Sequence, residues 1–189
     1  YGMTSQGGAN NLGTIFKILP DGTGFVKLLD FNGTSNGSSP KGSFISDGTF
    51  LYGMTSDGGI DNKGTIFKIL TDGTGYVKLL DFDGSTYGSF PQASLYFDGT
   101  YLYGTTQNGG TNGIGTIFKI LPNGSGFQTL KSFSGALNGL NPVSTLVSDG
   151  AYLYGITKSG GLYTKGTLFK IMPDGTNFLN IVDFNDGAL

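Results

Sequence analysis

The chain has 189 residues, a formal net charge of −2, and neither cysteine, histidine nor tryptophan. Its 13 acidic residues are all Asp and its 11 basic residues are all Lys, a balance that excludes a generally basic nucleic-acid-binding protein. The missing Cys excludes a disulfide scaffold, and no apolar run approaches the roughly 18 residues that a membrane-spanning helix needs.

Strands are favoured over helices, because Glu and Arg are absent while 35 residues are Gly. The segment GTIFKIL begins at Gly13, Gly64 and Gly115 and returns as GTLFKIM at Gly166, always after 51 residues. Internal repeats with a period of about 20–50 residues indicate solenoids, propellers or arrays. We therefore expect a single repeat domain over residues 1–189, with units 1–51, 52–102, 103–153 and 154–189.

Four short strands are predicted in each unit. A run after a proline comes first, and an Asp-Gly pair, which is a strong hairpin signal, leads to the second strand. A Gly/Asn-rich loop precedes the GTIFKIL strand, and a second Asp-Gly or Asn-Gly turn leads to the fourth. Examples in this order are Ala93–Phe97, Thr100–Thr106, Gly115–Leu121 and Phe25–Phe31.

Four antiparallel strands in about 50 residues match one propeller blade. The predicted fold is all-β, a β-propeller of about four four-stranded blades. One blade is incomplete, because the sequence opens at the second strand of a unit and the first unit has no first strand. Inner strands should be apolar on both sides, since each blade packs between two neighbours.

The order LYG.T..GG, GTIFKI and DGTGF..L..F recurs at fixed spacing over the whole chain. It resembles the GloVer tandem repeat of bacterial surface proteins, the family also called choice-of-anchor GloVer-containing. It is more loosely similar to the kelch repeat, whose Trp it lacks. The GloVer resemblance implies secretion and an extracellular or cell-surface location, and it transfers no catalytic residues.

Side chains that could catalyse a reaction or bind a metal are scarce. A Ser-His-Asp triad and zinc sites with His or Cys ligands are excluded, and no DxDxDG calcium loop occurs. We expect no catalytic residue, metal or cofactor. Asp in Asp-Gly turns should bond its own backbone, and Asp30, Asp81 and Asp183, with Ser132 in the third unit, should form inter-strand hydrogen bonds. The repeated lysines favour packed stems over a phosphate or glycan site: Lys17, Lys68, Lys119 and Lys170.

Candidate ligand residues lie in loops that vary between units. The position before the double glycine carries Gln6, Asp57, Asn108 and Ser159, and one return loop, which joins a fourth strand to the next proline, carries Tyr87 and Phe90. Aromatic rings beside amides and hydroxyls suit sugar binding, although a solvated loop is the simpler interpretation. Candidate glycosylation sequons begin at Asn32, Asn36 and Asn123.

Three functions stay open. The leading hypothesis is a non-enzymatic extracellular structural module that self-associates, because the incomplete first unit leaves an unpaired strand edge that another copy could fill by strand addition. Such head-to-tail contacts would propagate as a filament. The alternatives are a glycan-binding propeller and, last, an enzyme. No nucleic-acid partner and no membrane span are expected.

Overall fold

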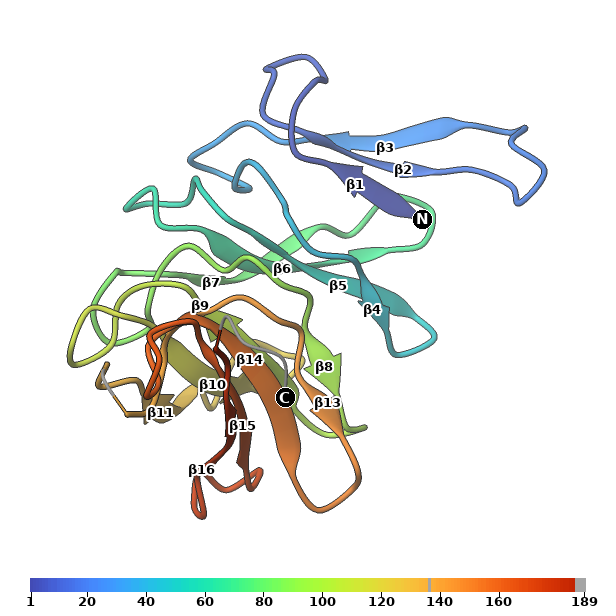
Figure 1. Ribbon diagram of the computed structural model, residues 1–189. Coiled ribbons are helices and arrows are strands. Elements are labelled where there is room, and N and C mark those ends of the chain that lie inside the picture. Colours follow the sequence, from blue (N-terminus) through green and yellow to red (C-terminus); the bar gives the residue numbers. More distant parts are fainter. Residues whose placement is uncertain (136, 186–189) are drawn as a thin grey trace.

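The computed structural model describes residues 1–135 and 137–185, and in these residues every regular element is a β-strand. The strands form four antiparallel sheets, which we call the first to fourth blades, and these follow one another in chain order from top to bottom of Figure 1. The described part of the chain therefore offers no helix that could span a membrane.

The first blade has three strands and the others have four or five. The first blade contains β1 (Gly2–Thr4), β2 (Thr14–Lys17) and β3 (Val26–Asp30). The second contains β4 (Ile45–Ser46), β5 (Phe50–Thr55), β6 (Thr65–Leu70) and β7 (Val77–Asp81). The third contains β8 (Tyr96–Phe97), β9 (Leu102–Thr106), β10 (Thr116–Ile120) and β11 (Gln128–Ser132). The fourth contains β12 (Leu140–Pro142), β13 (Val147–Ser148), β14 (Leu153–Ser159), β15 (Thr167–Ile171) and β16 (Leu179–Asp183).

The predicted strand order is confirmed, and the three described strands of the first blade correspond to the second to fourth strands of the predicted unit. Strand order runs β1-β2-β3, β4-β5-β6-β7 and β11-β10-β9-β8 in the first three sheets. In the fourth, β14 pairs with both β13 and the additional strand β12, which the sequence did not predict. Among the described strands, β1 pairs only with β2, so its outer edge is open.

The first strand of each complete blade is shorter than predicted, with only two residues in β4, β8 and β13. The residues just before these strands bond instead to the neighbouring blades. The Ser43 amide donates to Ser94 Oγ (2.7 Å), and the Ser94 amide donates to Thr145 Oγ1 (3.1 Å). These three residues occupy one position of the repeat, 51 residues apart, so the bonds link consecutive blades.

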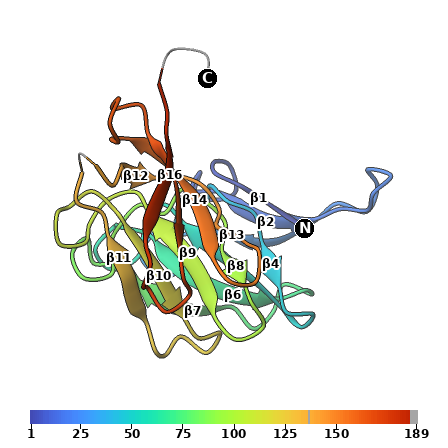
Figure 2. The same cartoon turned by 60° about the horizontal axis from the view of Figure 1, so that its bottom comes forward.

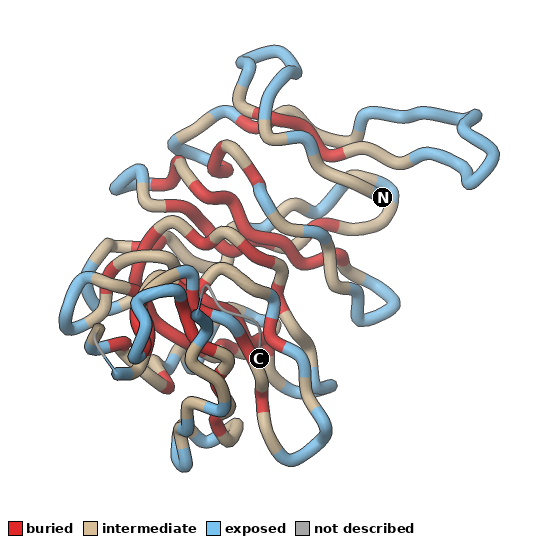
Figure 3. The backbone as a smooth tube through the Cα atoms, in the orientation of Figure 1, coloured by how far each residue is buried: buried red, intermediate tan, exposed pale blue. Residues whose placement is uncertain are grey.

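The hydrophobic core lies between blades rather than within them. Three buried clusters occur, and each combines residues from two consecutive blades. In the middle blades, β5 and β9 are buried along almost their whole length, as Figure 3 shows in red. Along strand β14, buried residues alternate with more exposed ones, because no described blade follows the fourth. This confirms the expectation that inner strands are apolar on both faces.

The phenylalanine of each GTIFKI strand explains the glycine of the Tyr-Gly pair. Gly104 pairs with Phe118 across β9 and β10, and the Phe118 ring lies over the glycine. A Cβ on Gly104 would come within 2.5 Å of Phe118 Cζ. The same fit recurs between Gly53 and Phe67. The two motifs are therefore one packing unit, although about a dozen residues separate them in the sequence.

Candidate functional site

Three of the four predicted loop positions lie beside return loops. Asp57 and Asn108 form backbone bridges to Ser38 and Ser89, with N–H···O distances of 2.9–3.1 Å. Ser159 pairs with Leu140 between β12 and β14, whereas Gln6 is exposed. The backbones of Asp57, Asn108 and Ser159 thus fasten return loops to the following sheet. The structure does not bring the four side chains together into one site, because they belong to four different blades.

The two predicted aromatic residues are packed in different ways. The Tyr87 ring lies edge-on against Phe127 of the third blade, with centroids 4.8 Å apart, and it belongs to the cluster between the second and third blades. Phe90 has a positive φ of 55° and holds the Lys63 ammonium 4.9 Å from its ring centroid. Both rings therefore support the return loop that carries them.

The three sequon asparagines differ in accessibility. Asn36 is buried, and its Nδ2, the atom that would carry a glycan, donates to the Asp30 carbonyl (3.2 Å). Asn32 and Asn123 are exposed. Asn123 Oδ1 accepts from the Ser125 amide (2.9 Å) and so shapes the turn between β10 and β11.

The turn aspartates bond their own backbone, as predicted. Three of them also accept a hydroxyl from the tyrosine of the Tyr-Gly pair: Tyr52 to Asp47 (2.7 Å), Tyr103 to Asp98 (2.8 Å) and Tyr154 to Asp149 (2.7 Å). The Tyr154 hydroxyl and the amides of Tyr152 and Ala151 lower the pKa of Asp149 to about 2. Burial and the Asp47 carboxylate raise the pKa of Tyr52.

Acid should therefore destabilise the chain within a defined pH window. A carboxyl whose pKa is lowered on folding contributes stability above its unfolded pKa, near 3.9, and loses it as the pH falls to the folded pKa. We expect the urea midpoint to stay constant down to about pH 4 and to fall between about pH 4 and 2. Asp149→Asn, which keeps an oxygen acceptor but cannot titrate, should make this fall shallower. An unchanged slope in this variant would contradict the assignment.

Two of the four repeated lysines connect blades. Lys68 Nζ donates to the Pro122 carbonyl of the next blade (3.3 Å) and lies 4.5 Å from the Phe50 ring centroid. Lys119 repeats the arrangement with the Pro173 carbonyl (3.2 Å).

The carboxylates that were expected to form hydrogen bonds between strands bond to loops instead: Asp81 Oδ1 accepts from the Ile60 amide (3.1 Å). Within residues 1–135 and 137–185, no three Asp side chains gather in an arrangement that could hold a metal ion.

The lysine of the fourth strand forms an ion pair within its own blade. In the first blade Lys27 Nζ lies 2.7 Å from Asp30 Oδ2, and in the second Lys78 Nζ lies 2.8 Å from Asp81 Oδ2. The third blade has Thr129 at the position of the lysine. Ser132 stands at the position of the aspartate, so two hydroxyl groups replace the ion pair in this blade.

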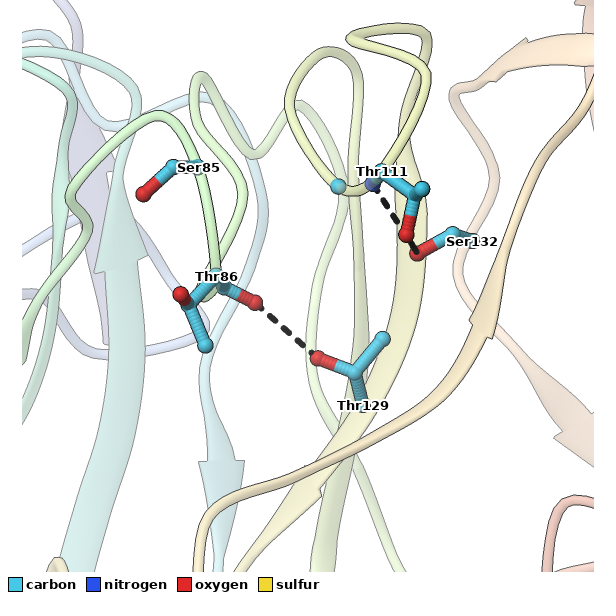
Figure 4. Close-up of a pocket in the computed structure, with 6 residues that line it drawn as sticks. Ser85, Thr86, Thr111, Thr129 and Ser132 are labelled. Atoms are coloured by element: carbon cyan, nitrogen blue, oxygen red, sulfur yellow. Dashed lines mark hydrogen bonds between the residues drawn. The ribbon is translucent and has the colours of Figure 1, made fainter.

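A cavity of about 440 Å³ lies beside Thr129 and Ser132, between the second and third blades. Figure 4 shows the second blade's return loop on one side and β11 with the loop before β10 on the other. The lining residues are Ser85, Thr86, Gly110, Thr111, Thr129 and Ser132. Of these residues, the sequence had drawn attention only to Ser132, which replaces the aspartate of the other units. The signal that marks the site is a set of departures from the repeat within one unit.

The first and fourth blades each expose one face that is covered in the other blades. On the first blade, Ile18 is 43% exposed and Phe25 61%, and the β2–β3 hairpin that carries them projects from the molecule (Figures 1 and 3). Figure 2 shows the same projection from another side. We call Phe16, Ile18 and Phe25 the leading face. The trailing face of the fourth blade consists of Ile156, Leu168, Ile181 and Phe184.

This architecture is that of β-propeller blades, and similar solved structures support it. The structure resembles a chain of a nidogen/laminin complex (TM-score 0.61, 17% identity, 90% of this chain and 55% of that chain). It also resembles a putative TolB from Agrobacterium tumefaciens (TM-score 0.60, 14% identity, 92% and 58%). A third is a putative 6-phosphogluconolactonase from Bacteroides uniformis (TM-score 0.55, 14% identity, 96% and 52%). At these identities the likeness shows the fold alone, and the chain spans only part of each structure.

The sequence itself defines the family. The model of the Gloeobacter/Verrucomicrobia repeat matches residues 1–135 and, in an overlapping second match, residues 96–188. The chain therefore belongs to the Gloeobacter/Verrucomicrobia repeat family, which confirms the GloVer resemblance. Among curated proteins, none matches the sequence.

Proposed function

We propose that this chain is a non-enzymatic structural module whose blades associate face to face with further blades of the same repeat. The observation that carries the proposal is the exposure of the leading and trailing faces. Ile18 is 43% exposed, whereas its equivalents Ile69 and Ile120 are fully buried by the preceding blade. The repeat thus encodes an apolar surface that only another blade covers.

The two faces are complementary, because each internal interface already joins a trailing face to a leading face. Phe133 of the third blade meets the ring of Phe169 in the fourth, with centroids 5.4 Å apart. Two further pairs have the same geometry, Phe31 with Phe67 and Phe82 with Phe118, each at 5.6 Å. Phe184 and Phe16 occupy the corresponding positions on the outer faces, so docking one on the other would repeat this contact.

Two features make this a head-to-tail association. Trailing and leading faces are different surfaces, so contact between two copies is heterologous and leaves one free face on each. The open edge of β1 adds unpaired backbone groups beside the leading face, which another strand could satisfy. We propose that the partner is a second copy of this repeat, and that the assembly lies outside the cell or on its surface.

Sedimentation velocity tests the proposal. We expect the 189-residue chain to form oligomers as its concentration rises, and Phe25→Asp or Phe184→Asp to make it monomeric, because a charge in an apolar contact is costly. Mixing the two variants should restore a one-to-one dimer, because each retains the face that the other lacks. That dimer should not grow further.

Ile60→Asp is the matched control. Ile60 is 72% exposed and belongs to neither face, so this substitution should leave association unchanged. A wild-type chain that stays monomeric at high concentration would overturn the proposal. So would a mixture of the two face variants that forms no dimer. The surface location is tested separately, by labelling intact cells with an impermeant reagent.

A further inference from the structure

We propose that the cavity between the second and third blades binds an uncharged polyhydroxylated ligand of about monosaccharide size. The site is independent of the assembly faces, which lie on the first and fourth blades. It also differs from the loop positions that the sequence suggested for sugar binding. Three features of the cavity support this assignment: its lining departs from the repeat, its walls are neutral, and its volume suits such a ligand.

The cavity exists because one contact between blades is made with a shorter side chain. Lys78 of the second blade ion-pairs with Asp81 and reaches the Thr34 carbonyl of the preceding return loop (3.4 Å). Its equivalent Thr129 reaches the corresponding loop by donating from Oγ1 to the Thr86 carbonyl (3.1 Å). The threonine makes the equivalent contact, between the second and third blades, with far less volume, and space remains beside it.

Two further departures from the repeat face the same space. Ser132 stands where the other three units have aspartate, and Thr111 stands where they have Ala9, Ile60 and Leu162. Thus an ion pair and an apolar residue have been replaced by three hydroxyl groups, all in one unit. All three hydroxyl groups line one cavity (Figure 4).

The lining selects against charged ligands. None of the six lining residues carries a charge, so a phosphate, carboxylate or ammonium would find no counter-charge among them. Hydroxyl groups both donate and accept, and their best complement is a ligand with the same property. Ser132 Oγ accepts from the Thr111 amide (3.3 Å), which leaves its own proton for a ligand oxygen.

The size of the cavity fits this class of ligand. Its volume of about 440 Å³ falls in the range of about 300–1,000 Å³ typical of small-molecule sites. The two walls come from consecutive blades, and the Gly110 amide, which donates to the Ser85 carbonyl (2.8 Å), ties them together. A single sugar ring, or the terminal ring of a neutral glycan, would therefore be held between preformed walls.

The experiment titrates the 15N-labelled chain with D-glucose, D-galactose, D-mannose and N-acetyl-D-glucosamine, with inorganic phosphate as the charged probe. At least one sugar should shift the amide signals of Ser85, Gly110 and Thr111 with a millimolar dissociation constant. Phosphate should leave these signals unchanged. Because the readout is local, it remains valid whether or not the chain self-associates.

Two variants test the assignment to this cavity. The double variant Thr129→Lys/Ser132→Asp restores the ion pair of the first two blades, so it should fold, fill the cavity and weaken sugar binding at least tenfold. Thr129→Val keeps the shape but removes one hydroxyl, and it should weaken binding several-fold. The proposal is overturned if no sugar shifts these amides, if phosphate binds in preference, or if the ion-pair variant binds as well as the wild type.

Discussion

Phe118→Ala is expected to lower the free energy of unfolding by about 3–5 kcal/mol, the range for truncating a fully buried Phe. Phe118 is completely buried, meets Phe82 of the second blade edge-on at 5.6 Å, and stacks on Phe127 at 5.2 Å. Removing the ring leaves a cavity in the interface between blades and uncovers Gly104. Urea unfolding followed by tyrosine fluorescence and circular dichroism measures the loss.

Phe16→Ala is the matched control, because Phe16 occupies the same position of the repeat in the first blade. There it belongs to the leading face and is only partly buried, since no described blade precedes it. We expect its truncation to cost about 1 kcal/mol, near the average for point substitutions. Equal losses in the two variants would contradict the conclusion that packing between blades, rather than the individual sheet, stabilises this fold.

The architecture could be predicted from the sequence because repetition multiplies each weak local signal. One Asp-Gly pair followed by a short apolar run is ambiguous, but the same order in every unit indicates a blade. The pairing of β1 with β2 was predictable for the same reason, since the equivalent strands pair in the same way in the complete copies. The short length of β8 was not predictable, because Ser94 bonds to the adjacent blades instead of extending the strand.

The candidate sites were harder to predict, because they depend on contacts between blades. Tyr87 stands in a variable loop, and only the structure shows its ring against Phe127. Thr129 and Ser132 are visible departures from the repeat, yet the sequence does not show that Lys78 spans two blades. Without that contact, the loss of a lysine does not indicate a cavity. The two apolar outer faces likewise become evident only when equivalent residues are compared for burial.

The glycine that opens each GTIFKIL segment should be among the least replaceable residues of the chain. Gly115 has a φ of +112°, and a Cβ there would lie 2.6 Å from the Thr106 carbonyl oxygen and 2.5 Å from Pro142 Cδ. Its amide donates to the Gly109 carbonyl and its own carbonyl accepts from the Phe133 amide, both at 3.0 Å, so the backbone cannot move aside. We expect Gly115→Ala to lower the free energy of unfolding by about 2–5 kcal/mol, the sum of a left-handed backbone and a forced overlap.

Gly113→Ala separates these two contributions. Gly113 lies in the same loop with a φ of +74°, but a Cβ there would have nothing within 4 Å. Its substitution should therefore cost only the left-handed backbone, about 1–2 kcal/mol. Both variants reduce the entropy of the unfolded chain equally, so that effect cancels in the comparison. If urea unfolding gives the two variants the same stability, then backbone conformation alone explains the repeated glycine. A larger loss for Gly115→Ala shows that the glycine admits Pro142 of the return loop against the sheet, and so couples one blade to the next.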